Sequence, residues 1–159
     1  MEVSRRHTIL LVEDNPADVK IMQRALSHSA SRAELVVVRD GQEALDYLLR
    51  QGAYTADRPN GHPLPAPWTC PDLIVLDLNL PRVSGAEVLR KVREAPPLSL
   101  TPVVVLSTSR HPEDVREAYA AGANTYLEKP RKFDHFVEML RMVQQFWLEM
   151  AVLPPAPVA

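Results

Sequence analysis

The chain of 159 residues has almost no cysteine, since Cys70 is the only one. A single thiol cannot form an internal disulfide, and the sequence has no CxxC pair and no His/Cys cluster with the spacing of a metal site. We interpret Cys70 as a small, half-buried hydrophobic residue. These absences exclude a disulfide-stapled fold and a structural zinc site.

The chain also lacks a charge excess and a long apolar run. Eighteen basic residues stand against 20 acidic ones, with no basic block of the kind that follows a nucleic-acid backbone. The first apolar run, at residues 8–12, is too short for a signal peptide or a membrane span. We therefore expect a soluble cytoplasmic protein that binds neither nucleic acid nor membrane. The length and the hydrophobic content of 46% suit one domain, at residues 8–150, followed by an extended tail at 151–159.

Short apolar runs alternate with segments of helical periodicity. The runs predict strands at residues 8–12, 35–38, 73–76, 103–106 and 125–127. The periodic segments predict helices at residues 16–28, 41–50 and 85–93, between Pro112 and Gly122, and at 132–150. This alternation is typical of a doubly wound α/β fold with a five-stranded parallel sheet. The five prolines within residues 51–71 predict a surface loop, and those between Pro154 and Pro157 predict an extended, unpacked end.

Acidic residues stand where two predicted strands end. Glu13 and Asp14 follow the first strand, and Asp77 follows the third. In an open parallel sheet, ligands bind in the crevice at the carboxyl ends of the strands. If these strands are neighbours, three carboxylates meet there and repel one another unless a cation neutralises them. Mg²⁺, which prefers oxygen ligands, is the natural cation.

Two further polar residues, Ser107 and Lys129, end the fourth and fifth strands. An aspartyl carboxylate can accept a phosphoryl group when nearby donors neutralise the transferred oxygens. Asp77 would be the nucleophile, and Mg²⁺, the Ser107 hydroxyl and the Lys129 ammonium would be the donors. Each residue alone has a plainer explanation, as a helix-start carboxylate, a loop hydroxyl or a solvated lysine. Their coincidence at four strand ends favours the reactive site.

Four motifs resemble a known family: ILLVEDNPAD at 9–18, LIVLDLNLP at 73–81, PVVVLSTS at 102–109 and GANTYLEKP at 122–130. On these motifs the chain, over residues 8–148, resembles the receiver domains of bacterial response regulators. The resemblance implies a flavodoxin-like fold with strand order 2-1-3-4-5 and a phosphorylation switch served by a sensor histidine kinase. It also implies that the protein is not an ordinary enzyme, because it catalyses only its own phosphorylation and slow dephosphorylation.

The resemblance assigns roles to individual residues. It implies a phosphoacceptor at Asp77, metal ligands at Glu13, Asp14, Asp77 and the Asn79 backbone carbonyl, catalytic roles for Ser107 and Lys129, and a switch pair of Ser107 and Tyr126. Serine replaces the family's more frequent threonine at position 107, so a looser switch is expected. The Lys129–Pro130 bond is usually cis in the family, and we expect it to be cis here. Ser109 and the Asn79 side chain fall at positions that tune the lifetime of the phosphoaspartate.

Weaker features resemble one subfamily, the stand-alone regulators paired with phytochromes. They are the long loop after the second helix, the sequence motif DLNLP, and Phe146-Trp147-Leu148 followed by Leu153-Pro154. A bacteriophytochrome is therefore a candidate kinase.

Other protein classes share part of the pattern. A phosphatase of the haloacid dehalogenase type needs a second acid where Asn79 stands. A pseudo-receiver that only binds partners would lack an acid, the acceptor or the lysine, and a flavodoxin-type flavin carrier would not place Glu13 and Asp14 against a phosphate. We expect no output domain, so the signal leaves through a surface contact or the chain is a phosphorelay intermediate, and the sequence does not choose between these.

The last predicted helix carries two apolar stripes. The first, expected to pack on the sheet, comprises Phe133, Phe136, Val137, Leu140, Val143 and Trp147. The second comprises Met139, Met142, Phe146 and Met150. A helix on a sheet cannot easily bury both stripes, and exposed apolar strips mark interaction surfaces. We therefore expect a homodimer, as in phytochrome-type regulators, through residues 151–154 and through Met139, Met142, Phe146, Trp147 and Met150.

Overall fold

The computed structural model describes residues 6–29, 32–55 and 69–155. The strands are β1 (His7–Val12), β2 (Ala33–Val38), β3 (Leu73–Asp77), β4 (Val103–Ser107) and β5 (Thr125–Glu128). The α-helices are α1 (Pro16–Ser27), α2 (Gly41–Leu48), α3 (Gly85–Glu94), α4 (Pro112–Ala120) and α5 (Phe133–Gln144). Short 3₁₀ helices lie at Gly52–Tyr54 and Leu98–Leu100, and a π-helical segment, Gln145–Met150, continues α5. Every predicted strand and helix is confirmed, with ends that differ by a few residues.

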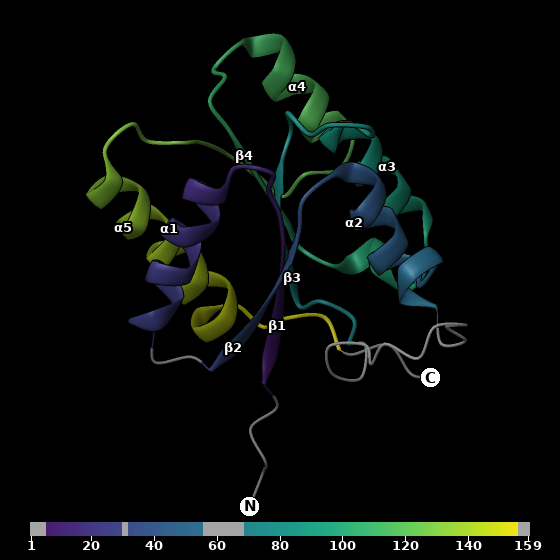
Figure 1. Cartoon of the computed structure of the whole chain (residues 1–159), viewed down its shortest axis with the longest axis horizontal. Coiled ribbons are helices and arrows are strands. Elements are labelled where there is room, and N and C mark those ends of the chain that lie inside the picture. The colour runs from purple at the N-terminus through teal and green to yellow at the C-terminus, as the bar shows by residue number, and fades with distance from the viewer. Residues whose placement is uncertain (1–5, 30–31, 56–68, 156–159) are drawn as a thin grey trace, which may run out of the picture.

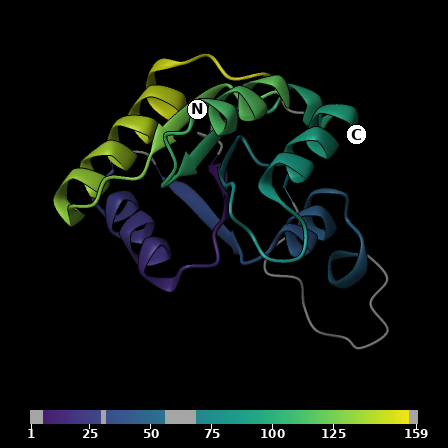
Figure 2. The same cartoon turned by 90° about the horizontal axis from the view of Figure 1, so that it is seen from above.

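The strands form one parallel sheet in the order β2-β1-β3-β4-β5, as the family resemblance implied. Helices α1 and α5 cover one face of the sheet, and α2, α3 and α4 cover the other (Figures 1 and 2). Each face has its own core, with Ile9, Val75 and Phe136 on the α1/α5 side and Leu10 and Leu76 on the other. Because alternate strand residues point to opposite faces, β3 and β4 are buried along their whole length.

Side-chain caps determine where the first helices begin. The Asn15 side chain accepts a hydrogen bond from the Ala17 N–H at 2.9 Å, and Pro16 occupies the first helical position of α1, as predicted. Asp40 caps α2 in the same way. Three residues separate β1 from α1 and two separate β2 from α2, so these connections hold their polar residues close to the strand ends.

The connection from α4 to β5 turns at Gly122, whose φ of 109° lies in the range that favours glycine. A Cβ atom there would lie 2.7 Å from Cγ of Arg93, so the backbone also passes closely over this side chain. The helical spacing of Val115, Ala118 and Tyr119 predicts that all three face inward from α4. This prediction is wrong for Tyr119, which is exposed and whose hydroxyl accepts a hydrogen bond from the Tyr126 N–H.

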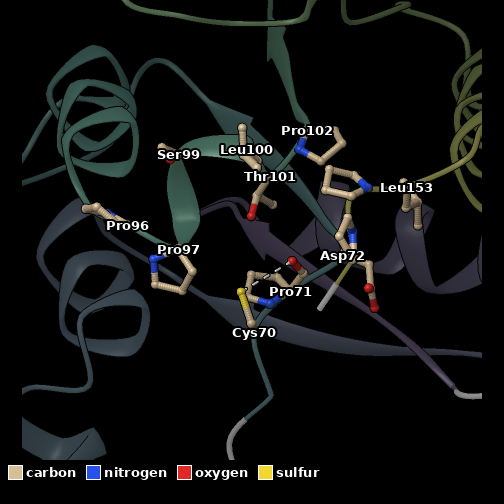
Figure 3. A pocket seen from close by; sticks show the side chains of 12 residues that line it. Cys70, Pro71, Asp72, Pro96, Pro97, Ser99, Leu100, Thr101, Pro102 and Leu153 are labelled. Atoms are coloured by element: carbon tan, nitrogen blue, oxygen red, sulfur yellow. Dashed lines mark hydrogen bonds between the residues drawn. The ribbon is translucent and has the colours of Figure 1, made fainter. Parts of the chain in front are cut away.

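The C-terminal extension turns back against the sheet. Leu153 packs on the α1/α5 core, and Leu153, Pro154 and Pro155 line a cavity of about 340 Å³ beside the half-buried Cys70 (Figure 3). The other lining residues include Pro71 and those just before β4, so the cavity lies at the amino-terminal ends of the strands.

The expectation of an unpacked tail is therefore wrong for Pro154, which is half-buried. Ala156 and Pro157 lie outside the described residues, as does the stretch 56–68 of the predicted loop. Within the described part of the chain, no helix has the length and apolar character needed to cross a membrane.

Candidate functional site

The sheet register brings the predicted residues to one edge. Val12 pairs with Leu76, so Glu13 and Asp77 leave neighbouring strands at the same level. Asp77 pairs with Leu106 of β4, which places Ser107 one residue farther along. The N–H of Lys129, just after β5, donates to the Ser107 carbonyl at 2.8 Å.

Three of the predicted carboxylates form one cluster. Oxygen atoms of Glu13, Asp14 and Asp77 all lie within 4.8 Å of one another. Glu13 and Asp77 are buried and Asp14 is exposed, so the cluster opens to solvent on one side. Backbone N–H groups hold the two buried carboxylates, since Asn15 donates to Glu13 at 3.1 Å and Asn79 donates to Asp77 at 3.0 Å. Several carboxylate oxygens gathered in this way suit a hard divalent cation.

The loop after Asp77 depends on Gly85, the first residue of α3. A Cβ atom at Gly85 would lie 2.4 Å from the Asp77 carbonyl oxygen. The Gly85 N–H also donates to the Leu78 carbonyl at 3.1 Å. Glycine therefore lets α3 begin against the end of β3 and holds the Asp77 backbone in place.

The Lys129 ammonium binds three carboxylates at once. Its Nζ atom lies 2.8 Å from Glu13 Oε2, 2.8 Å from Asp18 Oδ2 and 2.9 Å from Asp77 Oδ2. A lysine ammonium has three N–H donors, so each donor has one acceptor here. The side chain is only 9% exposed, and this ion cluster makes its burial possible.

Asp18 is the site residue that the sequence analysis missed. It lies in the first turn of α1, where an acid is already explained by its favourable interaction with the helix dipole. The available signal was its spacing, because residue 18 falls one helical turn after Asp14. Its partner Lys129 is 111 positions away in the chain, so the pair becomes visible only in the folded protein.

The pKa of Glu13 and the pKa of Lys129 are both raised, by different causes. The pKa of Glu13 is raised to about 7, because burial and the neighbouring Asp77 charge, which raise it, outweigh the hydrogen bond from Lys129, which lowers it. Burial acts to lower the pKa of Lys129. The hydrogen bonds to Asp18, Glu13 and Asp77 outweigh burial and raise the pKa above its ordinary value. The lysine thus stays charged, whereas a buried Glu13 carboxylate calls for a further cation.

Ser107 is buried, and its hydroxyl accepts a hydrogen bond from the Ser109 N–H at 3.1 Å. Tyr126 donates its phenol hydroxyl to the Ser109 carbonyl at 2.8 Å. Ser107 and Tyr126, the predicted switch pair, are therefore both hydrogen-bonded to Ser109 in the β4–α4 loop.

The prediction of a cis Lys129–Pro130 bond is wrong. Pro96–Pro97 is the cis peptide bond that occurs within the described residues, so the bond after Lys129 is trans. Trans is the favoured form of such bonds, and the four-carbon lysine side chain reaches all three carboxylates from a trans backbone.

Comparisons with known proteins agree with this geometry. The sequence model of the response regulator receiver domain family matches residues 9–141. Over 149 residues the chain is 41% identical to response regulator Rcp1 of Synechocystis sp., covering 93% of each chain. It is similar to the crystal structure of the phosphorylated cyanobacterial phytochrome response regulator RcpA, with 40% identity and a TM-score of 0.83 over 95% of this chain and 100% of that one. It is also similar to the Mn²⁺-bound form of Rcp1, with 39% identity and a TM-score of 0.82 over 94% and 99%.

The match covers most of the chain and includes the carboxyl end of every strand that carries a predicted site residue. The chain therefore belongs to the response regulator receiver domain family, the phosphorylation-dependent signalling proteins of two-component systems.

Proposed function

We propose that Asp77 accepts a phosphoryl group from the phosphohistidine of a sensor histidine kinase. The observation that carries this proposal is the position of Asp77, whose carboxylate belongs to the acidic cluster and also binds the Lys129 ammonium. In the transfer, a carboxylate oxygen forms the new P–O bond as the P–N bond of the donor breaks. The electron pair of that bond stays on the imidazole nitrogen, which takes up a proton from solvent. Lys129 and the Ser107 hydroxyl would bind the phosphoryl oxygens.

The acidic cluster would hold Mg²⁺ through Glu13, Asp14, Asp77 and the Asn79 backbone carbonyl. Support comes from the carboxylate oxygens within 4.8 Å and from the raised pKa of the buried Glu13. When bound, the cation would neutralise charge on the transferred phosphoryl group. Glu13 and Asp14 would orient it, and Lys129 would remain as the second positive charge.

Incubation with acetyl phosphate and Mg²⁺, followed by intact-protein mass spectrometry, tests the phosphoacceptor. We expect one phosphoryl group that hydroxylamine removes, as for an acyl phosphate. Asp77→Asn should gain none, because an amide is not a nucleophile toward phosphorus. Equal phosphorylation of this variant would place the acceptor elsewhere.

The signal would be a population shift of the β4–α4 loop, with Ser107 moving toward the phosphoryl group and Tyr126 following. Lys129→Ala should still accept a phosphoryl group but should transmit the signal poorly, because the ammonium links the end of β5 to the phosphoacceptor. Loop amide spectra that are identical with and without a phosphoryl mimic in the wild type would contradict the switch.

We propose a phytochrome-type kinase as the donor, because RcpA is a phytochrome response regulator of the same fold at 40% identity. Phosphotransfer from a purified bacteriophytochrome kinase, compared with an unrelated histidine kinase, is the direct measurement. A faster rate with the unrelated kinase would contradict this assignment.

We also propose that the receiver domain ends at residue 150 and that α5, its π-helical end and residues 151–154 form a homodimer interface. Met142, Phe146 and Met150 are 56%, 49% and 70% exposed, which supports an apolar surface along this helix. Met139 and Trp147 are half-buried beside them. Val152 of the extension is 99% exposed and adds a further apolar side chain directly after the helix, whereas Leu153 packs on its own core. We take a second copy of the chain as the occupant of this surface.

A further inference from the structure

Ser109, in the loop between β4 and α4, makes four hydrogen bonds through its N–H, its carbonyl and its hydroxyl. Its N–H donates to the Ser107 hydroxyl at 3.1 Å, and its carbonyl accepts from the Tyr126 hydroxyl at 2.8 Å. Its own hydroxyl accepts from the His111 N–H at 3.1 Å and lies 2.5 Å from Oδ2 of Asp114. One residue therefore contacts both members of the proposed switch and the start of α4.

The contact with Asp114 is the strongest of these bonds. A carboxylate can only accept, so the hydroxyl of Ser109 must donate its single proton to Asp114. A short O–H···O⁻ bond of this kind is charge-assisted and about twice as strong as a neutral one. The hydroxyl donates to Asp114 and accepts from the His111 N–H, so both of its hydrogen bonds are with the start of α4.

Asp114 also borders the proposed phosphorylation site. With Ser107, Asn79 and Glu117 it lines a cavity of about 140 Å³ between the β3–α3 loop and α4. The carboxylate that holds Ser109 therefore stands on the same side of the loop as the hydroxyl predicted to move.

We propose that Ser109 and Asp114 are positioning residues that transmit movement of Ser107 to α4. The inference depends on the proposed phosphorylation of Asp77. When Ser107 moves toward a phosphoryl group, its bond to the Ser109 N–H draws Ser109 along. Through its hydrogen bond to the Ser109 carbonyl, the Tyr126 hydroxyl then moves with Ser109. Through its hydrogen bond to the Ser109 hydroxyl, Asp114 moves too, together with the first turn of α4. A loop without the Asp114 bond would let Ser107 move while α4 stays in place.

Hydrogen-exchange mass spectrometry of the full chain in Mg²⁺, with and without fluoroberyllate as the phosphoryl mimic, tests this coupling. In the wild type we expect a change in exchange of the peptide that covers α4. In Asp114→Ala and in Ser109→Ala this change should fall at least threefold, while fluoroberyllate still protects the end of β3. The double variant should lose no more than either single variant, because both remove the same bond.

Glu113→Gln is the matched control, since Glu113 is an exposed acid one residue earlier in the same helical turn. It should keep the full α4 response. Asp114→Asn, which keeps the shape and an acceptor oxygen, should give an intermediate response and guards against an unfolded alanine variant.

The outcomes separate the two proposals. A wild type whose β3 end does not respond to fluoroberyllate would contradict the phosphoacceptor assignment, and the coupling with it. Three outcomes would overturn the coupling alone. The wild type could show a change in exchange at the end of β3 but none at α4, Asp114→Ala could keep the full change at α4, or Glu113→Gln could lose as much of it as Asp114→Ala.

Discussion

At the residue scale, the unusual feature is the charge balance around Lys129. Three carboxylates, Glu13, Asp18 and Asp77, bind one ammonium. Asp14 joins Glu13 and Asp77 in the cluster suited to a cation, and Asp18 lies outside it. Glu13 and Asp77 would have to serve both the lysine and the cation. Asp18 would serve only the lysine, so the position of the ammonium need not change when a cation arrives.

The raised pKa of Glu13 predicts pH-dependent cation binding. A cation needs the deprotonated carboxylate, and the pKa of about 7 means that protons compete for Glu13 near neutrality. We expect the apparent Mg²⁺ affinity to be level above pH 7 and to fall up to about tenfold per pH unit below it. Calorimetric titrations between pH 5.5 and 8.5 measure this, and an affinity independent of pH would contradict it.

The same pKa predicts the stability of the metal-free protein. The pKa of Glu13 in the folded protein lies above its ordinary value of 4.5, so between pH 4.5 and about 7 the folded state binds more protons than the unfolded chain. The free energy of unfolding should therefore decrease as pH rises through this window, by roughly 3 kcal/mol in total. Urea denaturation in EDTA, compared with Glu13→Gln, isolates the effect, because the variant should lack this decrease.

Asp18→Asn should weaken Mg²⁺ binding about three- to tenfold, on the order of 1 kcal/mol. The variant removes one negative charge near the cluster. It also frees the Lys129 ammonium to bind Glu13 and Asp77 more fully, in competition with the cation. Glu87→Gln is the matched control, an exposed acid at the equivalent first-turn position of α3. Equal affinities for both variants would show that Asp18 acts only on its helix.

At the element scale, the clearest departure from the sequence pattern is the end of α5. Periodicity of 3.6 residues predicted Trp147 inward beside Val143. The π-helical segment Gln145–Met150 widens the last turns, as the bond from the Ala151 N–H to the Phe146 carbonyl at 2.7 Å shows. Leu148 is therefore buried and Trp147 is only half-buried.

The first stripe departs from the prediction at two further positions. Gln144, a polar residue that the stripe did not include, is buried. Phe133, placed in the stripe, is 54% exposed because it is the first residue of the helix and lies beyond the core. Phe136, Val137, Leu140 and Val143 are buried as predicted.

Arg93 links α3 to two connections, the one from α3 to β4 and the one from α4 to β5. Its guanidinium donates to the carbonyls of Ser99, Thr101 and Gly122 and to the Asn124 side chain, at 2.7 to 3.1 Å. Arg93→Ala would remove all four of these hydrogen bonds and should lower the free energy of unfolding by about 2 to 3 kcal/mol. Urea denaturation measures the change.

Arg90→Ala, one turn earlier on α3, is the control for Arg93→Ala. Its ion pair with Glu117 at 3.2 Å is more than half exposed, so the cost should stay below about 1 kcal/mol. Equal losses for the two variants would mean that the Arg93 hydrogen bonds contribute little to stability.

At the scale of the whole molecule, the dimer prediction depends on which side chains of the last helix are exposed. Phe146→Glu should give a folded monomer that still phosphorylates, because a charge would replace an apolar contact at the centre of the proposed interface. Light scattering across a concentration series measures the assembly state.

Phe133→Glu is the matched control for Phe146→Glu. Phe133 is the same residue type at nearly the same exposure, 54% against 49%, at the opposite end of α5. It should leave the dimer intact. A wild type that is monomeric at high concentration, or a dimeric Phe146→Glu, would contradict the proposed interface.

The sequence by itself determined the order and type of the elements and the residues at the strand ends. Strand and helix periods are local properties, and parallel strands bring their carboxyl ends to one edge in any fold of this class. Glu13, Asp77, Ser107 and Lys129 were therefore predictable as neighbours.

Only the tertiary structure decided which of these neighbours touch. The ion pair of Lys129 with Asp18 depends on how α1 packs beside the loop after β5. The hydrogen bond from Ser109 to Asp114 depends on how the start of α4 packs against the β4–α4 loop. The π-helical end of α5 and the return of Leu153 to the core likewise follow from packing. Contacts of this kind join segments distant in the chain, so no local pattern records them.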